Sequence, residues 1–208
     1  MHRPRVVPVA LVAVVLIGAT LIGGSIATAA GQPRRNDAAR MMTDLMSGTA
    51  AVGGPFTLTD VDGRRRSLAD FRGKLVILYF GYTFCPDACP TNLASIAHLM
   101  QLLGPDSAKV QPLFVTLDPQ RDTAEVLREY VAAFDSRLVA LRGSETEVRH
   151  VATAYKLYFR KVYPSKSSTY FIDHASLTYL LDQEGRYVGF FPPGTTGERM
   201  VVLVRERL

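Results

Sequence analysis

Residues that bind metals or carry out redox chemistry are scarce in this sequence, which has 2 cysteines and 4 histidines among 208 residues. Two cysteines are too few for a disulfide framework, and a hydrophobic content of 48% allows a domain of this size to fold without one. Both cysteines, Cys85 and Cys89, lie in the stretch FGYTFCPDACP, four positions apart and each followed by a proline. This concentration in one short segment indicates a chemical role.

Excess positive charge is also scarce beyond the N-terminal region. The formal net charge is +5, but residues 49–208 contain 19 basic and 17 acidic side chains. A nearly balanced domain lacks the strongly basic surface that binds phosphate backbones. The charge distribution therefore argues against a nucleic-acid partner.

Charged residues are absent from residues 6–31, whose centre is VALVAVVLIGATLIGG. About 20 apolar residues cross a bilayer as a helix. A cleavable signal peptide is the alternative, because Ala27-Thr28-Ala29 has the small residues of a cleavage site. The run is longer than a usual signal core, which favours a retained single-pass transmembrane anchor over residues 1–31. Either form is expected to place the following domain on the extracytoplasmic or periplasmic side of the cell (inner) membrane, where cysteines are prone to oxidation.

Residues 32–53 are expected to form a juxtamembrane linker, and residues 54–208 the domain proper. The linker contains Met41, Met42 and Met46. These methionines favour an apolar stripe near the membrane over a relay for soft metal ions.

The pattern of residues 54–208 predicts strands and helices in alternation. A turn at Asp62-Gly63 indicates a hairpin, and KLVILYF (74–80) and VQPLFVTL (110–117) are typical of buried central strands. Apolar stripes predict helices over residues 90–103 and 123–134, another around 148–155, and a closing helix over the last dozen residues. Residues 155–163 alternate, and a turn at 183–185 indicates a second hairpin. This order predicts an α/β fold, namely a thioredoxin-like mixed sheet flanked by helices.

The prolines predict how the cysteines are held. A residue before proline is disfavoured in the α region, whereas proline itself is tolerated at the first helical position. Pro90 is therefore expected at or near the start of its helix, with Cys89 as the cap and Cys85 in the preceding turn. A helix N-terminus favours thiolate over thiol, so both sulfurs are expected to be reactive. They follow a central strand, and open α/β sheets form their sites at the carboxyl ends of strands.

Two such thiolates can exchange a disulfide or bind a soft metal. A static disulfide closing so short a loop would stabilise the fold little. Among the histidines, His98 and His150 lie off the apolar stripes of their helices and are expected to be exposed. His174 lies beside Asp173 at the entry to a late strand, where it is either a metal ligand or a hydrogen-bonded core residue. Two thiolates and one imidazole fall short of the four ligands of structural zinc, but they suit Cu(I) and Cu(II).

Three stretches resemble segments of the Sco/SenC family, the membrane-anchored thioredoxin-like proteins that help to assemble cytochrome c oxidase. They are FGYTFCPDACP, TLDPQRDT (116–123) and DHASLTYLLDQEG (173–185), which occur in the family's order and spacing. The similarity extends over residues 50–208. The resemblance implies a copper chaperone rather than a turnover enzyme. Its expected partners are cytochrome c oxidase subunit II, whose binuclear copper centre it would fill, a copper donor and a thiol reductant.

Carried over by position, the resemblance implies that one copper ion is bound by Cys85, Cys89 and His174. Asp173 is implied as a neighbour that orients or tunes the site, and Asp118 as a carboxylate that faces it.

The rest of the TLDPQRDT segment is expected to support this arrangement. Arg121 is expected to pair with Asp118 or with a surface of the oxidase. Asp122 or Thr123 is expected to cap the helix that follows.

Two other functions would use the same cysteines. As a redox-active pair, Cys85 and Cys89 would make the protein a thiol–disulfide oxidoreductase that reduces the cysteines of the oxidase copper site, with His174 as a bystander or proton relay. Three residues separate the cysteines here, whereas the thioredoxin motif has two, and the longer spacing favours metal chelation. A peroxidase of the peroxiredoxin type would need a dedicated activating arginine, which the spacing does not identify.

Overall fold

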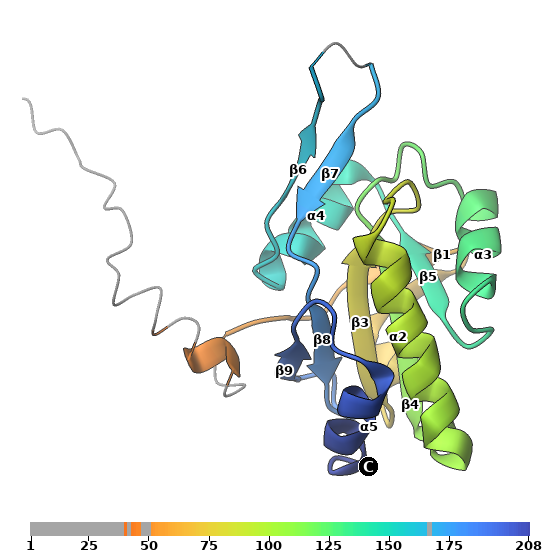
Figure 1. Cartoon of the computed structure of the whole chain (residues 1–208), viewed down its shortest axis with the longest axis vertical. Coiled ribbons are helices and arrows are strands. Elements are labelled where there is room, and N and C mark those ends of the chain that lie inside the picture. The colour runs from red at the N-terminus through yellow and green to blue at the C-terminus, as the bar shows by residue number, and fades with distance from the viewer. Residues whose placement is uncertain (1–39, 41–42, 47–50, 166–167) are drawn as a thin grey trace, which may run out of the picture.

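A mixed sheet of seven strands forms the centre of the computed structural model, which describes residues 40, 43–46, 51–165 and 168–208 (Figure 1). Across the sheet the strands are β2 (Arg65–Ser67), β1 (Thr57–Asp60), β5 (Val139–Arg142), β4 (Val110–Thr116), β3 (Leu75–Gly81), β8 (Thr178–Leu181) and β9 (Tyr187–Phe191). β3 pairs in parallel with β4, and β4 with β5, while the other neighbours are antiparallel. The predicted hairpins are confirmed as β1–β2 and β8–β9.

The two runs predicted to be buried central strands are confirmed as β3 and β4, which pair over their full lengths. Every residue of β3 is buried, and successive side chains point to opposite faces. On one face, Tyr79 packs on Phe114 and its hydroxyl accepts a hydrogen bond from the side-chain amide of Asn92. On the other face, Phe80 packs on Tyr155 and Tyr179. Apolar surface is thus available to helices on both faces of the sheet.

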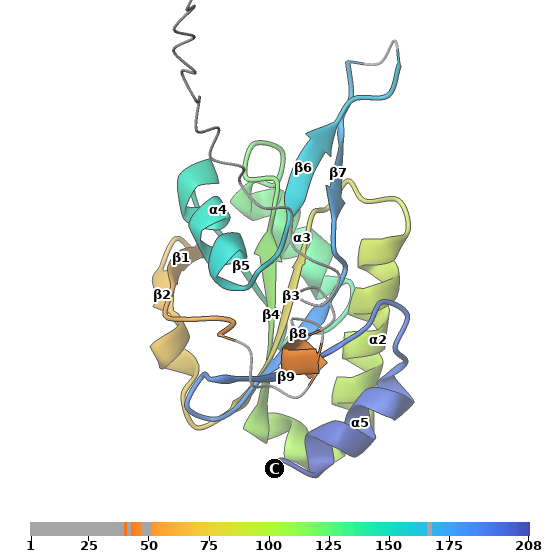
Figure 2. The same cartoon turned by 90° about the vertical axis from the view of Figure 1, so that its left-hand side faces the viewer.

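Helices cover both faces, as Figure 2 shows. α2 (Ala88–Leu103) and α5 (Gly197–Arg205) pack together on one face, and α4 (Glu145–Ala154) lies on the other. α3 (Ala124–Ala132) packs beside β5. The short 3-10 helices η1 (Leu68–Phe71) and η2 (Gly104–Lys109) follow β2 and α2, respectively. Gly197 permits the close approach of α5 to α2, because a Cβ there would lie 2.8 Å from the backbone nitrogen of Leu99. The predicted α/β architecture is confirmed.

Two features differ from the sequence prediction. β5 was not predicted, and residues 159–174 form a hairpin of their own. In this hairpin β6 (Phe159–Val162) pairs only with β7 (Phe171–His174) among the described residues, and the pair projects beyond the main sheet (Figures 1 and 2). Exposed residues alternate with more buried ones along both strands, so the strands lack the continuous apolar run that marks a buried strand. His174 is the last residue of β7.

The start of α2 corrects the prediction for Cys89. The helix begins at Ala88 with Asp87 as its N-cap residue, so Cys89 is its second residue rather than its cap. Pro90 is the third residue and lies near the first helical position, as predicted. Proline is accepted here because the amide groups of the first helical turn have no partner within the helix. The steric bias on the residue before proline is overridden in this first turn. Cys85 lies in the preceding turn, as predicted.

The predicted anchor over residues 1–31, Met41 and Met42 lie outside the described residues. Met46 is described and is 71% exposed. Within residues 40, 43–46, 51–165 and 168–208, no helix has both the length and the apolar character needed to cross a bilayer.

We expect Phe80→Ala to lower the free energy of unfolding by about 3–5 kcal/mol, because it leaves a cavity between β3 and the rings of Tyr155 and Tyr179. Urea denaturation followed by far-UV circular dichroism measures the change. Val202→Ala on the exposed face of α5 is the control, with an expected change within about 0.5 kcal/mol. Equal effects of the two substitutions would contradict this account of the core.

Candidate metal centre

The two cysteines lie where β3 passes into α2. A tight turn follows the strand, and the amide of Cys85 donates to the carbonyl of Tyr82. The amide of Cys89, in the first turn of α2, donates to the Sγ of Cys85 at 3.4 Å. Cys85 is half-buried and Cys89 is fully buried, and both are free thiols. The turn therefore presents one accessible sulfur above one inaccessible sulfur.

The last residue of β3 must be glycine for the buried sulfur to fit. A Cβ at Gly81 would lie 2.9 Å from the Sγ of Cys89 and 2.9 Å from the ring of Phe114. Both distances are shorter than ordinary van der Waals contacts. The sulfur of Cys89 thus packs directly against the backbone at the carboxyl end of the central strand.

The two thiols have opposite acidities. A hydrogen bond from the Cys89 thiol and the backbone amides of Asp87 and Cys89 lower the pKa of Cys85 to about 5, against the effect of burial. The same hydrogen bond to Cys85, together with burial, raises the pKa of Cys89. The hydrogen bond between the two sulfurs therefore favours the thiolate on Cys85 and the proton on Cys89.

His174 reaches the same corner from 85 positions further along the chain. Its Nε2 lies 3.8 Å from the Sγ of Cys89, and its ring meets the rings of Tyr79 and Tyr82 edge-on. The other ring nitrogen, Nδ1, lies 3.1 Å from the carbonyl oxygen of Ala175. This acceptor assigns the ring proton to Nδ1 and leaves the lone pair of Nε2 directed at the sulfur. Burial lowers the pKa of His174, which favours the neutral ring that a metal ligand requires.

The donor spacing fits one shared soft ion. Metal–sulfur and metal–nitrogen bonds of about 2.3 and 2.0 Å place two donors on one ion roughly 3.5–3.8 Å apart. Cys89 and His174 already have that separation. As the side chains stand, no group of three or more His, Cys, Asp or Glu residues in the described part of the chain is gathered to hold a metal.

The two carboxylates expected near the site have other partners. Asp173 is exposed and lies 3.4 Å from the guanidinium of Arg160, so the hydrogen-bond partner of the His174 ring is the Ala175 carbonyl and not this carboxylate. Asp118 has no exposed surface and forms an ion pair with Arg121, which agrees with the pairing expected for that arginine. It also accepts a hydrogen bond from the hydroxyl of Tyr170 at 2.7 Å.

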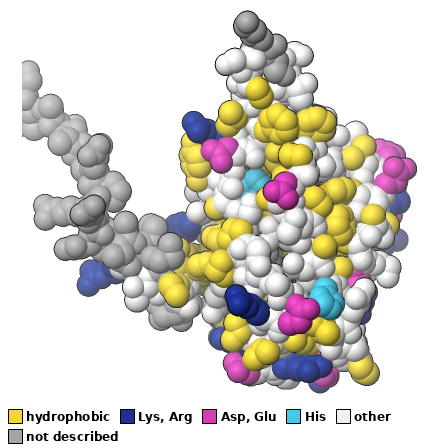
Figure 3. Space-filling view, in the orientation of Figure 1, with side chains coloured by type: hydrophobic (Ala, Val, Ile, Leu, Met, Phe, Trp, Pro, Cys, Tyr) yellow, Lys and Arg dark blue, Asp and Glu magenta, His cyan; other side chains and the backbone are white. Residues whose placement is uncertain are grey.

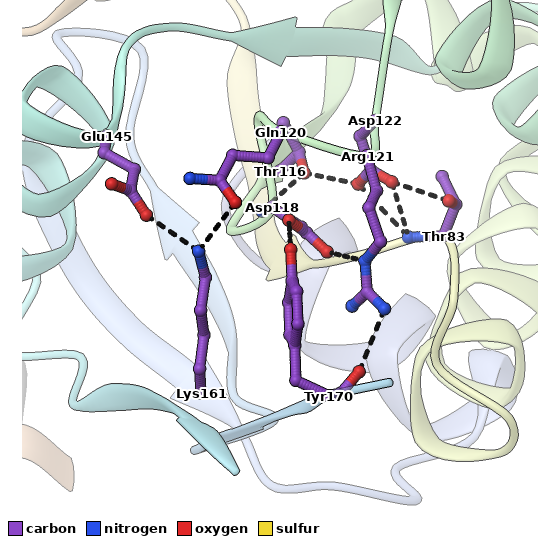
Figure 4. Close-up of polar contacts among 9 residues, drawn as sticks. All are labelled: Thr83, Thr116, Asp118, Gln120, Arg121, Asp122, Glu145, Lys161 and Tyr170. Carbon is purple, nitrogen blue, oxygen red and sulfur yellow. Dashed lines mark hydrogen bonds and ion pairs between the residues drawn. The ribbon is translucent and has the colours of Figure 1, made fainter. Parts of the chain in front are cut away.

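Asp122 is a residue whose role the sequence did not reveal. Its carboxylate is fully buried and accepts hydrogen bonds from the amide and hydroxyl of Thr83, at 3.2 and 2.6 Å, and from the hydroxyl of Thr116 (Figure 4). Burial raises its pKa. Thr123, the other candidate, is the N-cap of α3 and accepts from the amide of Val126. Asp122 is thereby free to tie the loop after β4 to the cysteine turn.

The surroundings of the site are apolar on the outer side. Phe84 and Phe171 are both exposed, and their ring centroids are 5.8 Å apart. Figure 3 shows hydrophobic side chains gathered at the end of the molecule from which the β6–β7 hairpin projects. The other two described histidines lie elsewhere: His98 is beside Glu198, and His150 is exposed on α4. Their predicted exposure is confirmed for His150, while His98 is partly covered.

The sheet, its flanking helices and the cysteines at the end of β3 define a thioredoxin-like protein. The SCO1/SenC family model matches residues 45–208. The SCO2-like protein RP587 of Rickettsia prowazekii is 40% identical over 67% of this chain and 69% of its own length. The mitochondrial SCO2 homolog of Bos taurus is 35% identical over 95% of this chain and 74% of its own length. The structure of Bradyrhizobium japonicum ScoI with copper bound superposes with a TM-score of 0.70 at 39% identity, covering 76% of this chain and all of ScoI.

The chain therefore belongs to the SCO1/SenC family. The family match spans the whole of the described sheet and its helices. It also agrees with the resemblance found from the three sequence segments.

We expect iodoacetamide to modify Cys85 much faster than Cys89 in the reduced protein, with the rate at Cys85 rising through an apparent pKa of about 5 and levelling above it. The sign follows from the mechanism, because only the thiolate reacts and its fraction grows as pH rises through the lowered pKa. Peptide mass spectrometry after timed quenching at pH 4–9 measures both rates. A rate at Cys85 that still rises steeply between pH 7 and 9 would contradict the assignment.

Proposed function

We propose that this protein binds one copper ion through Cys85, Cys89 and His174 and delivers it to the binuclear copper centre of cytochrome c oxidase subunit II. The observation that carries the proposal is the 3.8 Å approach of the His174 Nε2 to the Cys89 Sγ, across 85 residues of sequence. Family membership supports it, because the similar ScoI structure contains copper.

The donor set favours copper over other metals. Two thiolates select Cu(I), and an imidazole keeps Cu(II) acceptable. With both thiols deprotonated, the site has a net charge of −1 with Cu(I) and zero with Cu(II). A low net charge in either oxidation state limits the desolvation cost of a half-buried ion. Structural zinc would need a fourth ligand, and the two carboxylates that the resemblance places at the site, Asp173 and Asp118, are paired with Arg160 and Arg121.

The arrangement also supports transfer of the ion. Cys89 must lose its proton when the metal binds, whereas Cys85 already presents a thiolate at the surface. An acceptor can therefore attack from the side of Cys85 while Cys89 and His174 still hold the ion. The exposed rings of Phe84 and Phe171 would exclude water from that contact.

The location of the protein belongs to the same proposal. Residues 1–31 would anchor the chain in the membrane, residues 32–53 would form the linker, and the domain of residues 54–208 would face the periplasm. The uncharged run over residues 6–31 supports this arrangement. There a copper donor would load the site, and a thiol reductant would keep Cys85 and Cys89 reduced.

We expect the reduced domain to bind one Cu(I) per chain and His174→Ala to weaken binding by more than the roughly 10–100-fold that loss of an outer-shell partner costs. Competition with a chromophoric Cu(I) chelator measures the affinity. His98→Ala is the matched control, because that ring contacts Glu198 and not a sulfur. An affinity for His174→Ala equal to that of the control would remove His174 from the ligand set.

Delivery is a separate step and needs its own measurement. The copper-loaded domain would be mixed with the reduced copper-free soluble domain of oxidase subunit II. The absorption spectrum of the binuclear centre reports the transfer. Retention of all copper by the loaded domain would contradict delivery while leaving copper binding intact.

The asymmetry of the two thiols favours a second candidate function, reduction of the disulfide that the subunit II cysteines can form. The Cys85 thiolate would attack one sulfur of that disulfide and displace the other as a thiolate. Deprotonated Cys89 would then attack Cys85, which forms the Cys85–Cys89 disulfide and releases the partner with two thiols. A half-buried nucleophile above a buried resolving thiol suits this sequence.

We expect a reductase to act in copper-free buffer and to be unaffected by His174→Ala. Because the exchange consumes two thiols on this protein for the two that it forms on subunit II, the reaction is measured by alkylating the mixture and counting the modified cysteines of the subunit II domain by mass spectrometry. Cys85→Ser should leave the subunit II disulfide intact. Cys89→Ser should stop at a mixed disulfide between Cys85 and subunit II, because the second thiol is needed to release the partner. An intact subunit II disulfide after reaction with the unsubstituted reduced domain would rule out this function.

A further inference from the structure

The β6–β7 hairpin that carries His174 is not held by the main sheet. Its strands pair with each other and with no strand of the seven-stranded sheet among the described residues. The chain re-enters that sheet at Thr178, four positions after His174. On the other side, the amide of Leu157 donates to the carbonyl of Ala152 at 2.8 Å, two positions before β6 begins. Between these two points no backbone–backbone hydrogen bond joins residues 159–174 to the rest of the described chain, so side-chain contacts hold the direction in which the hairpin leaves the molecule.

Tyr170 makes the densest of these side-chain contacts. Its hydroxyl donates to Asp118 Oδ1 at 2.7 Å, and its own carbonyl accepts from the Nη1 of Arg121 at 2.9 Å (Figure 4). The guanidinium carbon of Arg121 lies 3.8 Å from the centre of its ring, and the Nζ of Lys161 lies 4.8 Å away. One residue immediately before β7 is thus bound at its hydroxyl, ring and backbone.

Asp118 and Arg121, which contact Tyr170, are themselves held in place by other contacts. Asp118 has no exposed surface, and its ion pair with Arg121 compensates for the cost of burying its charge. The guanidinium of Arg121 also lies 4.7 Å from the ring of Phe84, next to Cys85. Arg121 is therefore stacked between a ring of the cysteine turn and a ring of the hairpin, a geometry that its planar group suits and a lysine does not.

We propose that Tyr170 is a positioning residue of the metal site. It latches the β6–β7 hairpin to the loop after β4, and this latch sets the approach of His174 to Cys89. Along a strand that rises about 3.3 Å per residue, Tyr170 lies roughly 13 Å from His174, far enough to stop the hairpin rotating about its base. The copper readout of this inference rests on the proposed function, whereas the structural readout does not.

Tyr170→Phe tests the latch with the least disturbance, because it keeps the ring and carbonyl that Arg121 contacts and removes only the hydroxyl that reaches Asp118. Without copper, we expect amide hydrogen exchange at residues 159–162 and 171–174 to become about tenfold faster, the size of effect expected for one lost hydrogen bond to a charged group. With copper, we expect Cu(I) affinity to fall roughly tenfold, as for an outer-shell partner. Tyr158→Phe, an exposed tyrosine of the same region, is the matched control and should change neither quantity.

A double-mutant cycle separates positioning from a general structural role. If Tyr170 acts through His174, Tyr170→Phe should lower copper affinity in the unsubstituted protein but not in a His174→Ala background. Equal losses in both backgrounds would overturn the proposal, and so would faster hairpin exchange without any loss of affinity. If His174→Ala itself leaves affinity unchanged, the ligand assignment fails. In that case the latch is judged by hydrogen exchange alone, and unchanged exchange in Tyr170→Phe overturns it.

A second substitution covers the case in which Tyr170→Phe does not fold. Arg121→Lys keeps a positive charge beside Asp118 but loses the planar group between Phe84 and Tyr170. It should accelerate exchange in the same residues and lower copper affinity in the same direction. Arg66→Lys, whose guanidinium lies 5.0 Å from the ring of Phe71 away from the cysteines, is its control. Identical behaviour of the two lysine variants would overturn the latch.

Discussion

Two carboxylates with no exposed surface, those of Asp118 and Asp122, hold together the segments that meet at the cysteines. A carboxylate removed from water is costly unless donors surround it. Asp122 finds donors on Thr83 in the cysteine turn, and Asp118 finds them on Arg121 and on Tyr170 before β7. Each carboxylate therefore fastens the loop after β4 to a different neighbour. The loss of either contact would leave a desolvated group, so the relative positions of the three segments are strongly specified.

This framework explains how one short motif acquires two chemically different sulfurs. Cys85 lies in a turn open to solvent and accepts an amide hydrogen bond from the helix start, whereas Cys89 packs under Gly81 with no exposed surface. The first is stabilised as a thiolate and the second retains its proton. Metal exchange and disulfide exchange both require an accessible nucleophile beside a protected partner. The same asymmetry would suit either of the two proposed functions, copper delivery and thiol reduction.

Much of the fold was predictable because long apolar runs have one stable location in an α/β domain. KLVILYF and VQPLFVTL became the paired central strands β3 and β4, and the apolar stripes became helices. β5 was missed because four residues give too short a pattern. The assignment of Cys89 as the cap of α2 was wrong because the local bias of a residue before proline is smaller than the constraint of the surrounding fold. β6 lies within the alternating run noted over residues 155–163, but β7 and its pairing with β6 were missed because β7 has no continuous apolar pattern.

The sequence by itself determined where the cysteines lie, because their position between a buried strand and an apolar helical stripe is a local property of the chain. It also carried the three segments that resemble the SCO1/SenC family. Only the tertiary structure decided which of the two thiols is the more acidic and that His174 lies beside Cys89. It also decided that Asp122 accepts hydrogen bonds from Thr83 instead of capping α3. These outcomes depend on burial and on donors that lie tens of residues apart. Neither the burial nor these contacts exist until the sheet has brought the ends of its strands together.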